Sequence, residues 1–328
     1  MSAPVDPEAL GRADDWSSVR ALVVGFDAAG FAAADNLLHL GAQVAVVDET
    51  ARGREEQAEL LEVLGARLRL EPGATTARVE DDLRDVDVVV VSPDVAADAP
   101  LPAQAHRRAL PVWGEVGLAW RLRDPDAPAP WLVVAGGRPI RGVLHAAEAI
   151  LRAEGLRTVV AGEEGLPLVE AVMDPVPYDA LVVGLSAAQL RDAGAMSPLA
   201  AAVVAPGEDR RLGRAYGLVQ EACVYRVDDP GAEVLVRDAD VVEGARAIGV
   251  TLGTPTVGML GLVEDLLVDR AFIAERATSA AELGALADVG PADVEPEQVA
   301  DALVAAALAR ARGVPQAAVR DGLRAAAR

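Results

Sequence analysis

Apolar runs alternate with segments of helical period near the start of the chain. The run ALVVGF, residues 21–26, is followed by a helical segment and then by a second run, AQVAVVDE, at residues 42–49. An apolar run, a turn with glycine, a helical segment and another run are typical of a βαβ unit. A helical segment at about 53–66 and the run DVVVVSP, residues 87–93, continue the alternation. The pattern predicts a mainly parallel sheet with helices on both faces.

A second alternating series begins at WLVVAGG, residues 131–137. Helices are predicted at about 142–154, and at about 295–312 and 315–327, where two helical segments close the chain. The predicted strands between them are RTVVAG, DALVVGLS, AAVVAP, ACVYRV and AIGVTLG. This series predicts a second α/β domain.

The two series are separated by RDPDAPAP, Arg123 to Pro130, which has three prolines and two acidic residues. Such a stretch is too stiff and too polar to continue a helix, so it predicts a linker. A length of 328 residues agrees with about two domains. We therefore expect a polar leader over residues 1–17, a Rossmann-like domain over 18–123, a linker over 124–130 and a second domain over 131–328.

The charge balance is strongly acidic. Asp and Glu number 51 against 30 basic residues, giving a formal charge of −21. Nucleic acids and anionic lipids need a basic surface, so we expect neither nucleic-acid binding nor membrane insertion. No apolar run is long enough to span a bilayer, no secretory signal is recognisable, and Cys223 is the single cysteine. A cytoplasmic location is predicted.

All 30 basic residues are arginine, and the chain contains no lysine. Any mechanism that requires a lysine is therefore excluded. Arginine cannot replace it freely, because a guanidinium is bulky, always charged, and unable to form a Schiff base or a carbamate.

The turn GFDAAG, Gly25 to Gly30, ends the first predicted strand and opens a helix. This is where a Rossmann fold binds a pyrophosphate, which favours a nucleotide or nucleotide sugar. The dinucleotide fingerprint wants glycine where this chain has Asp27, so an NAD enzyme is disfavoured. Asp48 ends the next strand, where an acid either meets a ribose or base edge or lies in solvent.

The loop in VVAGGRPIRG lies where a P-loop would bind phosphates. Pro139 removes an amide donor, Ile140 stands where the lysine is expected, and Arg141 stands where the hydroxyl is expected. ATP hydrolysis through this loop is not expected. Arg138 and Arg141 either attract an anion or are solvated.

Other reactive side chains lack partners at a useful spacing. His39, His106 and His145 are far apart in predicted helices, so no metal site is predicted. Cys223 lies in an apolar strand and is predicted to be a buried, inert thiol. Ser186 lacks the glycines of a nucleophile elbow, which gives little support to a serine hydrolase.

The order of motifs resembles the Mur ligase family, in particular the UDP-N-acetylmuramoyl-L-alanine:D-glutamate ligases of actinobacterial type. The resemblance runs from about Val19 to the end of the chain. It implies the family's N-terminal UDP-binding domain and its P-loop-like central α/β domain, with the third domain expected to be absent. The segments that carry it include GFAAADNLLHLGAQVAVVD, VVVVSPDVAADAPL, PVWGEVGLAWRLRDPDAPAPWLVV, EAILRAEGLRTVVAG, LVEAVMDPVPYD and VVEGARAIGVTLGTP.

The resemblance implies a site for the UDP moiety in the first domain. Its candidate residues are Gly25, Phe26, Ala28, Ala29, Gly30, Asp48, Ser92 and Pro93. Asp27 and Asp94 replace family glycines near the expected diphosphate, and Glu163 and Glu164 replace residues near the sugar peptide. Four carboxylates near an anionic ligand are expected to weaken its binding.

Several family motifs depart from their pattern in the central domain. The ATP loop GTNGKTT aligns with residues 136–141, which leaves a candidate anion site of Gly136, Gly137, Arg138 and Arg141. The positions of other motif residues, namely the magnesium glutamate, two histidines, an asparagine and the HNxxN segment, align with Gly184, Glu208, Leu212, Arg226, Pro296, Glu297 and Asp301. The family's carbamylated lysine cannot exist in a chain without lysine.

These departures predict a catalytically inactive Mur-ligase-like protein, with no catalytic residues and no cofactor. It is expected to bind a UDP-muramoyl precursor, or to dock onto a genuine Mur ligase or another cell-wall protein. One alternative is an ATP-dependent UDP-N-acetylmuramoyl-L-alanine:D-glutamate ligase completed by a partner subunit. Another is a sensor of a different anionic metabolite, bound with the help of Arg138 and Arg141.

Overall fold

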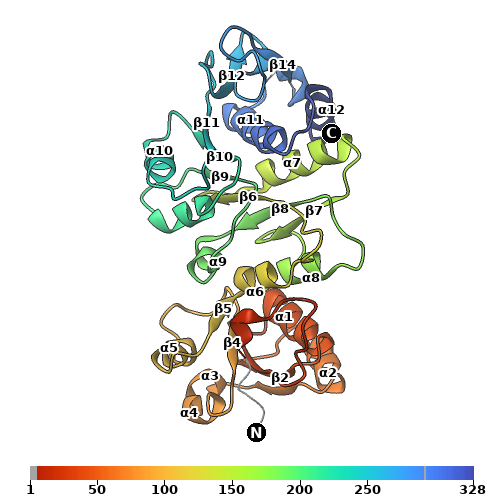
Figure 1. The fold of residues 1–328 in the computed structure, drawn as a ribbon, viewed down its shortest axis with the longest axis vertical. Coiled ribbons are helices and arrows are strands. Elements are labelled where there is room, and N and C mark those ends of the chain that lie inside the picture. Colours follow the sequence, from red (N-terminus) through yellow and green to blue (C-terminus); the bar gives the residue numbers. More distant parts are fainter. Residues whose placement is uncertain (1–5, 292) are drawn as a thin grey trace. The chain divides into compact units, whose positions relative to one another are not determined.

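The computed structural model describes residues 6–291 and 293–328, and the chain divides into two compact units (Figure 1). The first unit extends to Pro128 and also includes residues 167–177 and 191–194. The second contains residues 129–166, 178–190 and 195–328. The predicted domain boundaries therefore differ from this division at two short segments of the first unit.

The first unit is a parallel sheet with strand order β3-β2-β1-β4-β5. Its strands are β1 (Arg20–Val24), β2 (Gln43–Asp48), β3 (Arg67–Leu70), β4 (Val88–Val91) and β5 (Val112–Gly114). Its helices are η1 (Pro7–Ala9), α1 (Ala28–His39), α2 (Glu55–Val63), α3 (Ala74–Ala77), α4 (Val79–Asp82), α5 (Pro100–Arg107), α6 (Glu115–Arg121) and α8 (Leu168–Met173). The parallel α/β class is confirmed.

Alternate side chains of the central strands lie on opposite faces of this sheet. Leu22 and Val24 of β1 pack with Leu101 and Ala105 of α5 on one face. The intervening Val23 is also fully buried, on the side where α1 and α6 lie against the sheet. Apolar residues on both faces explain why the runs in this domain are continuous rather than alternating.

The short helix α8 belongs to the first unit although it follows two strands of the second in sequence. It packs against α1 and α6. The amide of Leu168 donates to Glu115 Oε1 at 2.6 Å, so the carboxylate at the start of α6 satisfies the first turn of α8. This packing is the physical reason for the difference from the predicted boundaries.

The expected polar leader also belongs to the first unit. Trp16 is fully buried and packs edge-to-face on Trp113, with ring centroids 6.4 Å apart. Its Nε1 donates to the carbonyl of Gly11 at 3.0 Å. The polar composition of the leader did not indicate that Trp16 would be buried. Residues 1–5 of the predicted leader lie outside the described residues.

The second unit is built on a sheet with strand order β14-β13-β12-β11-β10-β9-β6-β8-β7. Its strands are β6 (Trp131–Gly136), β7 (Thr158–Gly162), β8 (Ala180–Leu185), β9 (Ala200–Val204), β10 (Ala222–Arg226), β11 (Arg246–Val250), β12 (Met259–Val263), β13 (Leu266–Asp269) and β14 (Ala281–Ala285). Its helices are α7 (Arg141–Ala153), α9 (Ala187–Arg191), η2 (Arg210–Tyr216), α10 (Pro230–Arg237), η3 (Leu286–Asp288), α11 (Pro296–Ala311) and α12 (Gln316–Ala326). The strands from β7 to β12 pair in parallel, and β12, β13 and β14 pair antiparallel.

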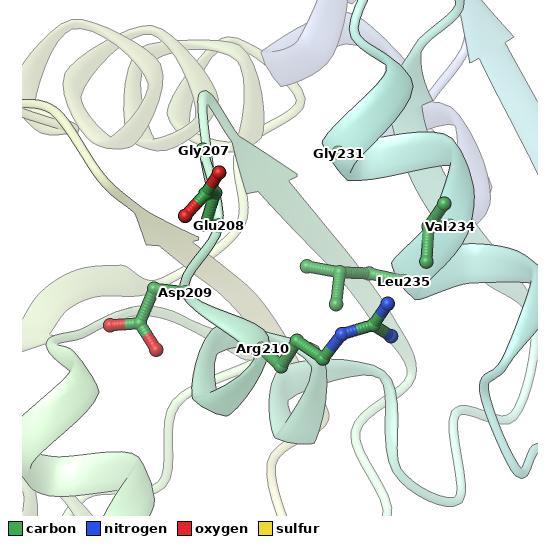
Figure 2. A pocket seen from close by; sticks show the side chains of 7 residues that line it. All are labelled: Gly207, Glu208, Asp209, Arg210, Gly231, Val234 and Leu235. Carbon is green, nitrogen blue, oxygen red and sulfur yellow. The ribbon is translucent and has the colours of Figure 1, made fainter.

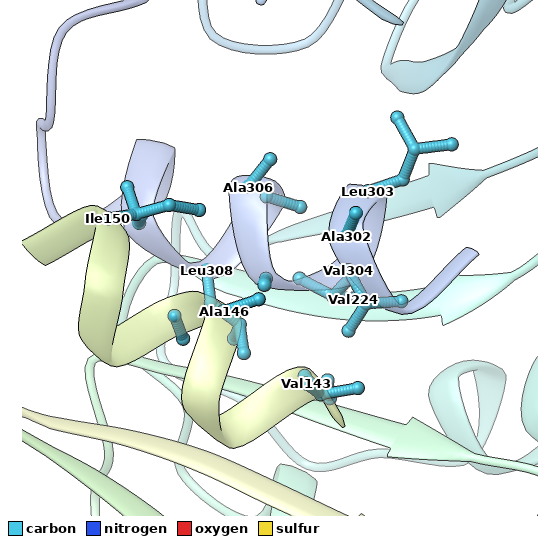
Figure 3. Close-up of a cluster of buried hydrophobic side chains, with 14 of the residues drawn as sticks. Val143, Ala146, Ile150, Val224, Ala302, Leu303, Val304, Ala306 and Leu308 are labelled. Carbon is cyan, nitrogen blue, oxygen red and sulfur yellow. The ribbon is translucent and has the colours of Figure 1, made fainter. Parts of the chain in front are cut away.

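One face of this sheet is covered by α7, α11 and α12. Figure 3 shows Val143, Ala146 and Ile150 of α7 beside side chains of α11 such as Ala306 and Leu308. The many alanines of α11 lack bulk, which permits close helix packing. On the other face, η2 lies against β6 and β9.

Tyr216 attaches η2 to the opposite face of the sheet. Its hydroxyl accepts from the amide of Val203 at 3.0 Å and donates to the carbonyl of Val224 at 2.6 Å. Burial raises the pKa of this fully buried phenol well above its ordinary value. Helices thus lie on both faces of this sheet as well. Among the described residues, no helix is long and apolar enough to cross a membrane.

Candidate functional site

The eight candidate UDP-binding residues lie together at one edge of the first sheet. Residues 25–30 form the turn from β1 to α1, Asp48 ends β2, and Ser92 and Pro93 follow β4. Because β2, β1 and β4 are neighbours in a parallel sheet, their carboxyl ends share that edge. The structure therefore brings together residues from three separate parts of the sequence.

Glycines make the close packing of this turn possible. Gly25 has a φ of +97°, and a Cβ there would lie 2.6 Å from Ser92 Cβ. A Cβ at Gly30 would lie 2.1 Å from the carbonyl oxygen of Gly25. The amide of Phe26 donates to Asp48 Oδ2, which links the turn to the end of β2. Contacts within the chain therefore define the shape of the turn.

Asp27 occupies the N-terminus of α1 with its own carboxylate. It accepts from the amide of Gly30 at 2.8 Å and from the hydroxyl of Ser92. The pKa of the nearby Asp94 carboxyl is raised by burial, and the charge of Asp27 raises it further. The amide of Gly30 and the hydroxyl of Ser92, which could donate to an anionic ligand, therefore already donate to a carboxylate of the chain.

The β6–α7 loop of the second unit lies at a topological switch point. Strand β8 pairs with one side of β6, and β9 pairs with the other. Ligands of open α/β sheets bind at such points, outside the carboxyl ends of the strands. The candidate residues Gly136, Gly137, Arg138 and Arg141 lie in this loop and at the start of α7.

The loop lies tightly against the end of β9. The amide of Gly137 donates to the carbonyl of Val204 at 3.1 Å. A Cβ at Gly137 would lie 2.3 Å from the carbonyl oxygen of Ala205, so this position requires glycine. Ile140, at the position expected for lysine, is buried in the apolar core. Its side chain therefore supports the fold and offers no charge to a ligand.

Arg138 is bound by carboxylates of α11. Its Nη1 lies 3.3 Å from Asp301 Oδ2, its Nη2 contacts Asp301 Oδ1, and Nη2 is 2.7 Å from Glu297 Oε1. Arg226 Nη1 reaches the other oxygen of Glu297 at 2.8 Å and also pairs with Asp228. Four positions that depart from the family motifs thus meet in one network, which we call the charge cluster: Arg138, Arg226, Glu297 and Asp301.

Burial and pairing shift the pKa values of Asp301 and Arg138. Burial raises the pKa of Asp301 above its ordinary value, although its hydrogen bond to Arg138 lowers it in part. Burial lowers the pKa of Arg138, but the bonds and charge of Asp301 outweigh this, so the pKa is raised.

Arg141 has a different partner from Arg138. Its Nη2 lies 2.8 Å from Glu164 Oε2, and its side chain is 66% exposed against 22% for Arg138. Burial, with a smaller effect from Glu164, raises the pKa of the neighbouring Glu163. The two candidate arginines therefore each contact a carboxylate of their own. That they bind an external anion remains a prediction.

The residues present do not fit a magnesium ion. Gly184 lies near the end of β8 against the core, where a Cβ would lie 2.9 Å from Leu144 Cδ1. The part of the chain that the structure describes has no group of three or more His, Cys, Asp and Glu side chains able to hold a metal.

The segment with Glu208 and Leu212, at the expected histidine positions, follows β9. Leu212 is buried, whereas Glu208 lines a cavity of about 440 Å³ between this segment and α10. Figure 2 shows Arg210 extending toward Leu235 and Val234 across this cavity. Arg210 pairs with Asp238 at 3.3 Å, and Asp209 pairs with Arg211 at 2.6 Å.

The remaining reactive side chains lie where the sequence predicted. His39, His106 and His145 are in α1, α5 and α7. Cys223 is buried in β10, and burial raises its pKa to about 12. Ser186 exchanges hydrogen bonds with Gln189 at the start of α9. The predicted inert thiol is consistent with this burial.

Sequence reasoning missed the charge cluster as a unit. It singled out Arg138 as a residue that could bind an external anion. It treated Arg226, Glu297 and Asp301 as separate departures from the family motifs. A signal was present, because two of the four positions had become basic and the other two acidic. Their partnership depends on the contact between a loop and a helix 163 residues apart.

Comparison with known proteins supports the fold. The structure is similar to a murein peptide ligase from Psychrobacter arcticus, with a TM-score of 0.55, 14% identity, and coverage of 94% of this chain and 68% of that one. A UDP-N-acetylmuramate:L-alanyl-γ-D-glutamyl-meso-diaminopimelate ligase from Neisseria gives the same TM-score and identity, over 94% of this chain and 98% of that one. These likenesses define the fold as that of the Mur ligases. No family model matches the chain.

Sequence relatives are more specific. The UDP-N-acetylmuramoylalanine–D-glutamate ligase of Streptomyces avermitilis is 43% identical over 325 residues, which cover 95% of this chain and 68% of the relative. That of Streptomyces coelicolor is 43% identical over 327 residues, with the same coverage, and that of Thermobifida fusca is 38% identical over 325 residues. The chain belongs to the Mur ligase family, with these D-glutamate ligases as its relatives. It spans about two thirds of the length of the two Streptomyces proteins.

The comparisons overturn one functional prediction. The motif departures predicted a catalytically inactive protein, but relatives at up to 43% identity are D-glutamate ligases. That prediction rested on a few motif positions, whereas the sequence identity to the ligases extends along both units. The ligase alternative agrees better with the relatives.

Proposed function

We propose that this chain takes part in the ATP-dependent joining of D-glutamate to UDP-N-acetylmuramoyl-L-alanine, with a partner subunit completing the site. The single observation behind this proposal is the 43% identity to D-glutamate ligases along 95% of the chain. Such identity across both units favours the same substrates over an unrelated anionic metabolite.

In this proposal the first unit holds the UDP-muramoyl precursor. The ends of β1, β2 and β4 supply a compact turn, with Asp48 and Ser92 at its sides. The acid at the end of β2 is placed to meet the ribose or base edge, in the manner of α/β nucleotide sites. The N-terminus of α1 favours a diphosphate through the helix dipole, although the amide of Gly30 already donates to Asp27.

The partner supplies the groups that handle the nucleotide. The chain has no lysine for the phosphates, and Pro139 takes the place of an amide donor in its loop. In ATP-dependent chemistry, a cation on the β and γ phosphates offsets the charge that moves during transfer. A genuine Mur ligase, the partner predicted from the sequence, would bring a lysine and a metal site.

The test is incorporation of labelled D-glutamate into UDP-N-acetylmuramoyl-L-alanine with magnesium and ATP. We would assay this chain, the Streptomyces coelicolor ligase, and their mixture at a fixed ligase concentration. The expected result is more product from the mixture than from the two proteins added together. The control is the chain with Gly30→Val, whose side chain would collide with Gly25 and block the turn.

Equal product from the mixture and from the sum of the separate proteins would contradict the proposal for this partner. The same gain with Gly30→Val would show that the precursor site of this chain is not involved. Product from this chain alone would support the ligase function but remove the need for a partner.

A further inference from the structure

The charge cluster fills the space in front of the nucleotide-type loop with charges of the chain itself. Asp301 Oδ2 lies so close to the first turn of α7 that a Cβ at Gly142 would be 2.8 Å from it. The side chains of Asp301 and Arg138 are only 13% and 22% exposed. A carboxylate thus lies against the loop and the helix start, where strand–loop–helix units of this kind receive an anion.

The balance of charge around the loop is negative. Two guanidiniums, of Arg138 and Arg226, are paired with three carboxylates, of Asp228, Glu297 and Asp301. An entering phosphate would meet this net charge and would compete with Asp301 for Arg138. Bidentate arginine–carboxylate contacts are among the stronger side-chain hydrogen bonds, so the competition is unfavourable to the phosphate.

We propose that Asp301 is an internal latch, which holds Arg138 and excludes a diphosphate group from the β6–α7 loop. This inference rests on the proposed function for the identity of the anion, and it gives a reason why the partner rather than this loop handles the nucleotide. The latch joins α11 to the loop, because Glu297 and Asp301 lie on that helix while Arg138 lies on the loop.

The test uses inorganic pyrophosphate and the full chain, with binding measured by isothermal titration calorimetry. Asp301→Asn removes one negative charge and leaves the side-chain shape, so we expect pyrophosphate to bind about tenfold more tightly than to the wild type. The double variant Asp301→Asn with Arg138→Gln is expected to return to the wild-type affinity. Asp288→Asn is the matched control, since Asp288 is a similarly buried acid paired with Arg324 outside the loop.

An affinity of Asp301→Asn no tighter than that of Asp288→Asn overturns the latch. If Asp301→Asn does not fold, as judged by circular dichroism, Glu297→Gln provides the test, because Glu297 is half exposed and contacts both arginines. A gain in affinity with Glu297→Gln supports the latch, and an unchanged affinity overturns it.

The experiment needs neither the precursor nor a partner. Failure of the latch would therefore leave the ligation proposal intact, and failure of ligation on mixing would leave the pyrophosphate result intact.

Discussion

Asp27 and Asp301 have comparable positions in the two units. Asp27 accepts from the amide of Gly30 at the start of α1, and Asp301 lies against the first turn of α7. Each places a carboxylate of the chain where an α/β unit offers donors to an anion. A single aspartate can therefore both stabilise a helix terminus and lower the affinity for a phosphate group.

The effect of Asp27 on precursor binding can be measured with Asp27→Gly. Loss of one charge near the diphosphate should tighten binding of UDP-N-acetylmuramoyl-L-alanine by about tenfold. Glycine is itself acceptable at a helix N-cap, so the loss of stability should be a few tenths of a kcal/mol. Titration calorimetry checks the affinity, with Asp6→Gly as control because Asp6 caps only the short helix η1. An unchanged affinity would exclude an electrostatic effect of Asp27 on the precursor.

Asp94 should make stability depend on pH. Its folded pKa lies above its ordinary value, because burial and the charge of Asp27 disfavour the ionised form. When Asp94 is ionised, at a pH above its folded pKa, it lowers the free energy of unfolding. This destabilisation disappears as the pH falls through the folded pKa toward the ordinary value of 3.8.

Asp94→Asn should thus raise the free energy of unfolding at pH 7 but not at pH 3.8. The gain should be less than about 1 kcal/mol, since the side chain is largely solvated. Urea unfolding at the two pH values checks this, with the nearby Asp98→Asn as control. An equal gain at both pH values would contradict the electrostatic cause.

At the scale of elements, the contact between α12 and α7 depends on one glycine. A Cβ at Gly322 would lie 2.3 Å from Ile150 Cα, which is backbone and cannot move aside. Gly322→Val should therefore lower the free energy of unfolding by about 3 kcal/mol, as expected for overpacking. The control is Ala325→Val, an exposed position on the same helix. Urea unfolding measures the loss of free energy of unfolding for each variant. An equal loss for both would mean that lower helix propensity, and not the contact between α12 and α7, is the cause.

The elements with long apolar runs were predictable from the sequence. The runs before Gly25, Asp48 and Ser92 are strands β1, β2 and β4, and the glycine turn opens α1 as expected. The short strand β3 has the sequence RLRL, and no continuous apolar run marks it. The antiparallel strands β12 to β14 were also missed, because they are short and interrupted by acidic and glycine residues.

The two candidate sites differ in how far the sequence could define them. The carboxyl ends of neighbouring parallel strands meet, so Asp48 and Ser92 could be placed beside the first turn without coordinates. The partners of Arg138 could not, because they come from α11, on a helix whose docking depends on the whole core. The local sequence pattern predicts the position of the loop, but the charge cluster can be identified only from the tertiary fold.

At the scale of the whole molecule, the formal charge of −21 should make stability depend on salt. Salt screens both the general repulsion and the exposed ion pairs. Since exposed pairs are each worth about 0–1 kcal/mol, we expect relief of repulsion to prevail. The melting temperature should rise between 20 mM and about 500 mM sodium chloride. The same titration at pH 4.5, near the calculated isoelectric point, is the control and should show a smaller rise. A fall in melting temperature at pH 7 would mean that the ion pairs dominate.

The two units are interleaved along the chain. The first needs residues 167–177 and 191–194, and the second uses α12, which ends at Ala326, to cover α7. During synthesis, the first unit is therefore incomplete until residue 194 has been added, by which point β6, α7 and β7 have already been synthesised. The apolar face of α7 stays uncovered until α12 has been synthesised, so these elements are at risk of aggregation during that interval.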